Sequence, residues 1–178
     1  MAGTPEKGRS RPEEEAIRAP SKYVIFGLVA CLVFAADQFT KYLVLTHVPL
    51  NRGFEIVRGY VDLVHARNPG AAFGIMAGSL WGLRPTFFLL ISIAALGIIL
   101  WMLIRFKDSG LMLILGYAFF FGGAAGNLLD RIRYGEVIDF LDVHVADVHW
   151  PAFNVADSAL CIGTALFFLH FFIRKPAS

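Results

Sequence analysis

Four long apolar stretches stand out along the chain and predict four membrane-spanning helices. The stretches cover residues 22–45, 85–104, 111–129 and 153–173. Each approaches the roughly 20 residues that an α-helix needs to cross a ~30 Å hydrocarbon core. The first stretch has no clear small-residue cleavage site and carries Asp37 and Lys41. We therefore interpret it as a retained helix rather than as a cleaved signal peptide.

The segment between the first two stretches, residues 47–84, has a different pattern. Apolar and polar residues alternate at 55–58 and 60–65, which is the period of a β-strand with one buried face. Pro69 and Gly70 end this alternation, and the residues that follow include apolar side chains suited to a membrane surface. The predicted fold class is a mainly α membrane protein, in which a small sheet and an interfacial helix cover one end of four transmembrane helices.

Composition supports a membrane protein and separates a polar tail from it. Hydrophobic residues make up 57% of the 178 residues and charged residues only 17%, which excludes an ordinary soluble domain. Residues 1–21 are instead rich in Pro, Gly and charged side chains, a composition typical of disorder. We predict a disordered cytoplasmic tail at 1–21 and one membrane-embedded domain at 22–175.

Charge and cysteine content narrow the possible partners. A net charge of +2 from scattered basic residues does not favour nucleic acid. Cys31 and Cys161 both fall inside predicted spans, where cysteine usually behaves as a small apolar residue rather than as half of a disulfide. An even number of spans puts both termini on one side of the membrane. Nine Lys or Arg residues on that side, against seven on the other, favour the cytoplasm for the termini.

Two aspartates at the edges of apolar stretches are the main candidates for chemistry. Asp139 follows the third predicted helix, and Asp157 lies in the first turn of the fourth. Both are thus expected at the same membrane level on neighbouring elements, where an ionisable group is costly and usually functional. Two close carboxylates share a proton, so that one acts as base and the other as acid toward a water that attacks an amide. The alternative for Asp157 is a role as helix cap.

For other polar residues near the same membrane level, the sequence allows either a role in the site or a simpler structural role. Asn127 and Arg131 share a helix face if the third helix persists that far, and Arg131 then reaches a carboxylate or a carbonyl. Asp130 and the Asp37–Lys41 pair would, in the simpler reading, only terminate or stabilise helix ends. The remaining candidates are Asn154, beside Asp157, and Asn68 and Gly70, whose turn either forms a bend or offers an amide to a substrate carbonyl.

The polar stretch at residues 142–151 is predicted to be a loop. It contains His144 and His149, interleaved with Asp142 and Asp147. Their spacing matches no established ligand motif, so no metal site is predicted there.

Three other functional classes are compatible with this composition. A transporter or proton channel would more naturally place its carboxylates near mid-membrane on broken helices or internal repeats, and neither is visible. An assembly protein would tolerate Asn at both Asp139 and Asp157, and a lipid transferase would add a group rather than remove a peptide. The glycines of GGAAG, residues 122–126, lack the Lys and Ser/Thr of a phosphate loop and indicate close helix packing instead.

Five short motifs together resemble the lipoprotein signal peptidase family, signal peptidase II. They are DQFTK (37–41), NPGAAFG (68–74), GGAAGNLLDR (122–131), VIDF (137–140) and PAFNVADS (151–158). They occur in the family's order and spread over most of residues 22–175, and only the polar tail lies outside the resemblance.

The resemblance implies a multi-pass aspartyl endopeptidase of the bacterial inner membrane. It would remove the signal peptide of a diacylglyceryl-modified prolipoprotein on the N-terminal side of the lipidated cysteine, as a monomer among membrane lipids and without metal or organic cofactor. Its four helices would carry a periplasmic β-cradle and an interfacial helix, with the site near the periplasmic face. By this resemblance Asp139 and Asp157 are catalytic, and the residues that line or support the site are Asn68, Gly70, Asn127, Arg131, Asn154, Asp37, Lys41 and Asp130.

Overall fold

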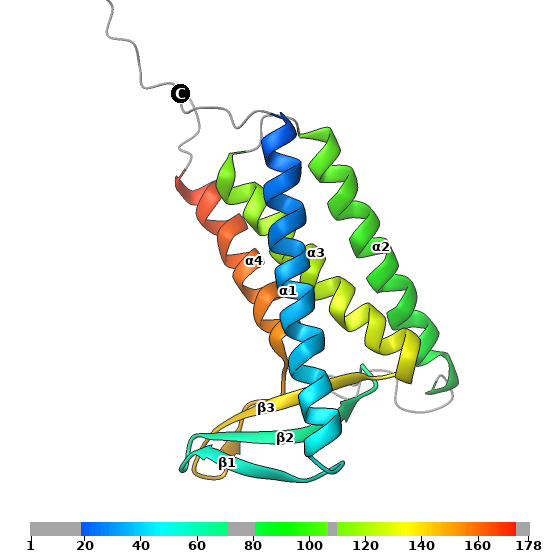
Figure 1. Ribbon diagram of the computed structural model, residues 1–178, viewed down its shortest axis with the longest axis vertical. Coiled ribbons are helices and arrows are strands. Elements are labelled where there is room, and N and C mark those ends of the chain that lie inside the picture. The colour runs from blue at the N-terminus through cyan, green and yellow to red at the C-terminus, as the bar shows by residue number, and fades with distance from the viewer. Residues whose placement is uncertain (1–18, 71–80, 107–109, 174–178) are drawn as a thin grey trace, which may run out of the picture.

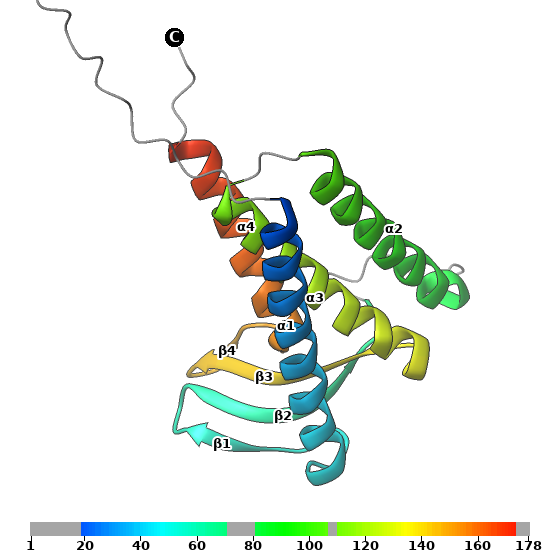
Figure 2. The same ribbon diagram turned by 45° about the horizontal axis from the view of Figure 1, so that its top comes forward.

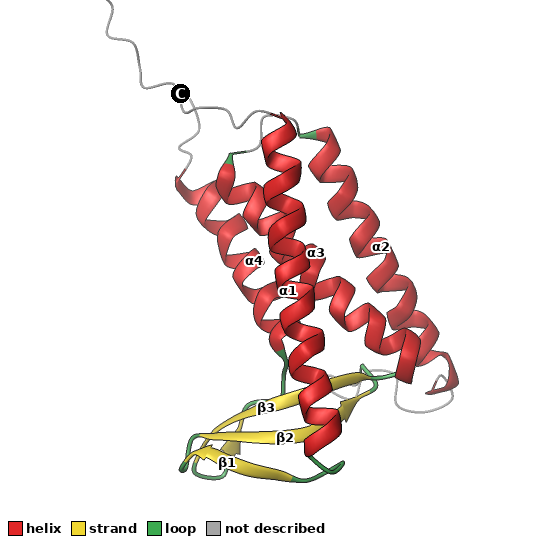
Figure 3. Cartoon of the chain, in the orientation of Figure 1, coloured by secondary structure: helices red, strands yellow, loops and turns green. Residues whose placement is uncertain are grey.

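The computed structural model describes residues 19–70, 81–106 and 110–173 as a helical bundle with a small sheet across one end (Figure 1, Figure 3). The long helices are α1 (Ala19–His47), α2 (Arg84–Arg105), α3 (Leu111–Tyr134) and α4 (Val155–Ile173). Their length and hydropathy qualify all four to cross a membrane, which confirms the predicted spans. Helix α3 continues past residue 129, the predicted end, to Tyr134.

The ends of the helices follow from local sequence. Pro85 stands in the first turn of α2, where its missing N–H has no partner to lose. Helix α3 ends at Gly135, whose φ of 75° is left-handed and whose N–H donates to the Arg131 carbonyl at 3.0 Å. At the opposite end of the bundle, buried Lys22 of α1 donates to the carbonyls of Leu103 and Phe106 and so caps α2.

Helix α3 lies at the centre of the bundle and packs against each of the other three (Figure 2). Its small residues allow this close approach. A Cβ at Gly122 would lie 2.7 Å from the Ala30 carbonyl oxygen of α1, and one at Gly123 would lie 2.6 Å from the Ala156 carbonyl oxygen of α4. The close helix packing predicted for GGAAG is therefore confirmed.

The sheet is antiparallel, with the order β1-β2-β3-β4. Its strands are β1 (Gly53–Val57), β2 (Val61–Asn68), β3 (Val137–Val145) and β4 (Val148–His149). The first two confirm the strands predicted from alternation. Strand β3 follows α3 and pairs with β2, so it joins the segment before α2 to the segment after α3.

The loop predicted at residues 142–151 is wrong over most of its length. Residues 143–145 and 148–149 form a hairpin instead, in which Val145 pairs with Val148 and His144 with His149. The polar side chains in this stretch alternate with valines, and a strand places the two kinds on opposite faces. The period of the polar residues, rather than their number, is therefore the feature that indicates the hairpin.

Two further predictions lie outside the described residues. The interfacial helix falls mostly within residues 71–80, and the polar tail falls mostly within residues 1–18. The structure describes only a short 3₁₀ turn, Trp81–Leu83, immediately before α2.

Candidate active site

Strand β3 and the start of α4 lie side by side and bring Asp139 close to residues 154–157. The N–H groups of Phe140 and Leu141 both donate to the Phe153 carbonyl, at 3.0 and 2.9 Å, and the Phe153 N–H returns a bond to Leu141 at 3.0 Å. The two aspartates thus meet at the sheet end of the bundle on neighbouring elements, as predicted.

Asp157 takes part in a capping box at the start of α4. The Asn154 side-chain oxygen accepts the Asp157 N–H at 3.0 Å, and Asp157 Oδ2 accepts the Asn154 N–H at 3.2 Å. Asp157 Oδ1 instead accepts from Asn127 Nδ2 at 2.9 Å. One carboxylate oxygen of Asp157 therefore caps the helix, as the alternative reading expected. The other accepts a hydrogen bond from Asn127 of α3.

Asp139 is almost fully buried, and both of its carboxylate oxygens accept a side-chain amide. Asn154 Nδ2 donates to Oδ1 at 2.7 Å, and Asn68 Nδ2 donates to Oδ2 at 2.9 Å. The Asn68 amide is itself oriented by the Gly70 N–H, which donates to Asn68 Oδ1 at 2.9 Å. Gly70 has a φ of +85°, and a Cβ there would collide with the Phe88 ring, so only glycine fits this turn.

The environment of Asp139 raises its pKa to about 6. Burial is the main cause, because it penalises the charged form, and the negative charge of Asp157 acts in the same direction. The amide donors of Asn68 and Asn154 and the charge of Lys41 oppose the rise. A carboxyl with this pKa can hold a proton at mildly acidic pH, which an ordinary aspartate does not.

A chain of side-chain amides separates the two aspartates. Asn154 Nδ2, which binds Asp139, also donates to Asn127 Oδ1 at 3.2 Å, and Asn127 Nδ2 binds Asp157. Among the described residues, no direct hydrogen bond joins the two carboxylates. Asn154 is common to both aspartates, because its side-chain amide donates to Asp139 and its backbone N–H donates to Asp157.

Behind these amides, Lys41 forms a buried ionic cluster with Asp37 and Asp130. Lys41 Nζ lies 2.9 Å from Asp37 Oδ2, 2.7 Å from Asp130 Oδ2 and 2.8 Å from Asn127 Oδ1. The side chains of all three charged residues are at most 2% exposed. Asp130 therefore does not simply snorkel to the surface at a helix end. Asp37 and Lys41 do form the i,i+4 pair of the simpler reading, and Asp130 of α3 joins them.

Each acid of this cluster holds the residue that precedes one of the two aspartates. Asp37 Oδ1 accepts the N–H of Ala156 at 2.9 Å, and Asp130 Oδ2 accepts the N–H of Ile138 at 3.3 Å. Sequence reasoning missed Gln38, whose amide donates to Asp37 and Asp130, each at 3.1 Å. Its position inside the DQFTK motif was the available signal.

Arg131 lies one helical turn from Asn127, because α3 persists to Tyr134. Its Nη1 donates to the Asn127 carbonyl at 3.2 Å and to Ser92 Oγ of α2 at 3.4 Å, and its guanidinium lies 5.8 Å from the centre of the Phe88 ring. The predicted shared face is confirmed, and of the two expected partners Arg131 reaches the carbonyl. Ser92, a lone serine in an apolar span, gave no sequence signal.

Within the described ranges, no group of three or more His, Cys, Asp or Glu side chains is arranged to hold a metal ion. The two aspartates, the three asparagines and the Lys41 cluster supply groups that can accept, donate and hold protons.

Comparison with known proteins identifies the family of this chain. The family model described as signal peptidase (SPase) II matches residues 29–173. The lipoprotein signal peptidase of Syntrophus aciditrophicus is 45% identical over 152 residues, which are 85% of this chain and 94% of that protein. The lipoprotein signal peptidase of Bacillus velezensis is 38% identical and covers 83% of this chain and 93% of its own length.

Solved structures of bacterial membrane enzymes share the fold. A bacterial membrane enzyme determined at 1.9 Å by the in meso method superposes with a TM-score of 0.75 at 33% identity, and the match covers 85% of this chain and 95% of that one. A second structure, also described as a bacterial membrane enzyme, gives a TM-score of 0.74 at 32% identity. The chain therefore belongs to the signal peptidase II family and is a multi-pass membrane peptidase.

Proposed function

We propose that this peptidase removes signal peptides from diacylglyceryl-modified prolipoproteins, on the N-terminal side of the lipidated cysteine, with Asp139 and Asp157 as its catalytic pair. One observation carries the proposal. Two carboxylates at the end of a membrane bundle are held separately by amide donors, Asp139 by Asn68 and Asn154 and Asp157 by Asn127. The lipoprotein signal peptidases to which the chain is similar support the choice of substrate.

The environments of the two aspartates support different roles. We assign Asp139 the role of the acid, because burial and the neighbouring negative charge raise its pKa and so favour its protonated form. Asp157, which is less buried, is assigned the role of the base. It takes a proton from a water molecule while the water oxygen bonds to the scissile carbonyl carbon, and Asp139 gives its proton to the carbonyl oxygen.

The tetrahedral intermediate then collapses with the opposite proton movements. The carbon–nitrogen bond breaks, the leaving nitrogen takes the proton from Asp157, and the new carboxyl group returns a proton to Asp139. The asparagines keep both carboxylates oriented through the cycle, so that the pair returns to its starting state. The reaction consumes one water molecule and needs no cofactor.

The location of the pair suits a substrate that stays in the membrane. The signal helix and the acyl chains of a prolipoprotein can remain in lipid while the scissile bond meets the aspartates at the end of the bundle. We place this end on the periplasmic side of the inner membrane and both termini in the cytoplasm, an orientation that the distribution of Lys and Arg favours. We propose that the enzyme works as a monomer.

The experiment measures cleavage of a purified diacylglyceryl prolipoprotein by detergent-solubilised wild type and by Asp139→Asn and Asp157→Asn. We expect either substitution to reduce cleavage by a factor of about 10²–10⁴ or more, because each removes a proton-transfer group. Asp147→Asn is the matched control, since it makes the same chemical change on an exposed residue in the hairpin turn. Thermal melts establish that each variant is folded.

Each outcome of this experiment decides between functional classes. Full cleavage by a folded Asp139→Asn or Asp157→Asn variant would move catalysis to other residues. No cleavage by folded wild type would favour a transporter or an assembly protein over a peptidase. Mass analysis of the product separates a peptidase, which releases a peptide, from a lipid transferase, which adds a group.

A further inference from the structure

The outer part of the sheet has one polar face. Glu55, Asp62 and Asp142 are opposite one another across β1, β2 and β3, and His144 is opposite His149. The imidazole rings stack at 4.6 Å, and His149 Nδ1 lies 3.0 Å from both carboxylate oxygens of Asp142. These contacts confirm that the histidines and acids share a face.

The opposite face is apolar. Phe54 pairs with Leu63, which pairs with Leu141, and Val61 pairs with Val143. The backbone N–H of Trp150 donates to the Val143 carbonyl at 2.8 Å, so Trp150 stands opposite Val143 on the same side of the hairpin. We call this the apolar sheet face; it consists of Phe54, Val61, Leu63, Leu141, Val143, Val145, Val148 and Trp150.

Much of the apolar sheet face is uncovered. Val145 is 63% exposed, Val148 77%, Trp150 70% and Phe54 58%. Among the described elements, neither β1 nor β4 packs against a helix. A contiguous apolar surface of this kind marks an interaction site, and the alternation of the strands shows that it is a whole face rather than scattered residues.

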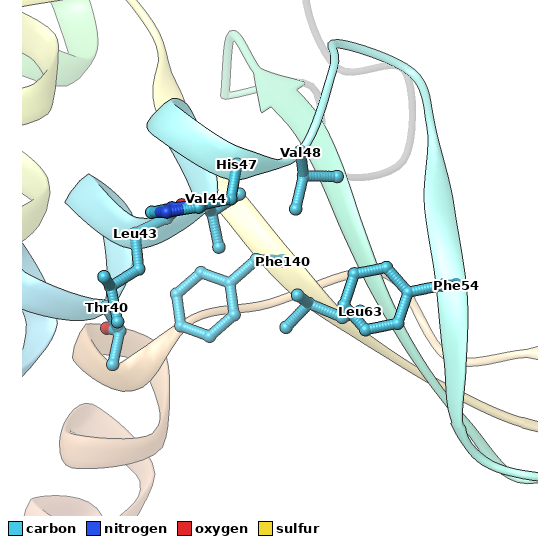
Figure 4. A pocket seen from close by; sticks show the side chains of 8 residues that line it. All are labelled: Thr40, Leu43, Val44, His47, Val48, Phe54, Leu63 and Phe140. Carbon is cyan, nitrogen blue, oxygen red and sulfur yellow. The ribbon is translucent and has the colours of Figure 1, made fainter.

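A hollow of about 390 Å³ lies at the α1 end of this face (Figure 4). Leu43 and Val44 of α1 form one wall, and Phe54, Leu63 and Phe140 of the sheet form another. In Figure 4 the Phe140 ring lies between the α1 side chains and Leu63. Because α1 spans the membrane and Leu43 is 39% exposed, the hollow borders the lipid-facing surface of the bundle.

The apolar sheet face also continues the lipid-facing surface of the bundle on the α4 side. Trp150 stands five residues before Val155, the first residue of α4, so it lies close to where that helix enters the membrane. Figure 1 shows the sheet lying across the end of the helices and extending sideways beyond α4. Such a sheet runs along the membrane plane, and tryptophan is the residue that favours the interface between water and hydrocarbon.

We propose that the apolar sheet face lies on the bilayer leaflet at the active-site end of the bundle, with lipid acyl chains entering the hollow beside α1. The partner is the bilayer lipid itself. The polar face, with its stacked histidines and acids, then faces water. The sheet carries Asp139 on β3, so the lipid contact also fixes the height of this aspartate relative to the membrane.

The test measures the depth of single tryptophans in proteoliposomes that contain phosphatidylcholine brominated on its acyl chains. Trp81→Phe and Trp101→Phe leave Trp150 as the only tryptophan. The matched control adds Trp150→Phe and His149→Trp, which moves the indole by one residue to the polar face. A second pair, in the background without native tryptophan, compares Phe54→Trp with Glu55→Trp. Thermal melts verify folding.

We expect bromolipid to quench Trp150 and the tryptophan at position 54 several-fold more than those at positions 149 and 55. Iodide in the water should show the opposite order. Equal quenching on the two faces would overturn the proposal. The proposal would also be overturned if Trp150 were protected from iodide without bromolipid quenching. Protection that rises with protein density would indicate a second copy of the chain as the partner. Protection that occurs only with added prolipoprotein would indicate the substrate.

The readout does not depend on catalysis. The single-tryptophan protein with Asp139→Asn should give the same quenching as its parent. Failure of the lipid contact is therefore distinguishable from failure of the proposed peptidase chemistry.

Discussion

The cluster around Lys41 and the cluster around the stacked histidines use similar chemistry at the same end of the molecule, but in opposite surroundings. Lys41 binds Asp37 and Asp130, and the side chains of all three residues are at most 2% exposed. His149 binds Asp142, and the two side chains are 49% and 19% exposed. The first cluster joins α1, α3, β3 and the start of α4. The second joins neighbouring strands only.

The difference shows that burial, rather than the identity of the charged groups, sets their structural importance. Removing one partner from a buried pair leaves a charge without compensation and costs about 3–5 kcal/mol. An exposed pair contributes about 0–1 kcal/mol, because water and salt screen the attraction. Three experiments test this comparison, in order of expected effect.

Lys41→Met should have the largest effect on stability. It leaves the carboxylates of Asp37 and Asp130 buried without a cation, so we expect the free energy of unfolding to fall by about 3–5 kcal/mol. Chemical denaturation in detergent micelles, followed by circular dichroism, measures this loss.

The double variant Lys41→Met with Asp130→Asn is the matched control. It removes one acid with the lysine and restores the original charge of the cluster. It should therefore recover part of the lost stability. If Lys41→Met is as stable as wild type, the cluster is not held by charge pairing.

The pH dependence of stability should distinguish Asp139 from the exposed acids. Its pKa is about 6 in the folded protein, against an ordinary value of 3.8. Between these pH values the folded state binds more protons at Asp139 than the unfolded state does. The contribution of Asp139 to the free energy of unfolding is therefore highest at low pH and is lost as the pH rises through 6. The total loss is about 3 kcal/mol.

Asp139→Asn lacks this titration. The stability of the variant relative to wild type should therefore improve by about 2 kcal/mol between about pH 4 and about pH 7, whatever constant offset the new amide introduces. Denaturation curves across this range measure the difference. A curve for Asp139→Asn that runs parallel to that of wild type would contradict the raised pKa.

His149→Ala should have the smallest effect. It removes a half-exposed partner of Asp142, so we expect the free energy of unfolding to change by less than about 1 kcal/mol. The same denaturation assay applies. A loss comparable to that of Lys41→Met would mean that the exposed cluster organises the sheet and that the comparison drawn from burial is wrong.

The helices were predictable from the sequence, whereas one part of the sheet was not. Hydropathy identifies a span because its signal is summed over about 20 residues. The hairpin at β3 and β4 depends on a few alternating residues and on pairing with β2, which is distant in sequence. Local polarity therefore predicted a loop where long-range pairing forms a strand.

The main candidate site residues were also predictable, but their hydrogen-bond partners were not. Asp139 and Asp157 could be singled out because carboxylates at the edge of apolar stretches are rare. Their separate amide donors come from β2, α3 and the segment before α4, an arrangement that only the fold creates. The spacing of Asp37 and Lys41 could not reveal burial, and the role of Gln38 depends on a neighbour on another helix.

The attachment of both aspartates to a single group of side chains has a mechanical consequence. Asp37 and Asp130 share Lys41, and they hold the backbone just before Asp157 and Asp139 respectively. Bilayers of different thickness change the tilt of spanning helices at a small cost in free energy. When α1 tilts, the cluster carries β3 and the start of α4 in the same direction. We therefore expect the separation of the two aspartates to depend little on bilayer thickness.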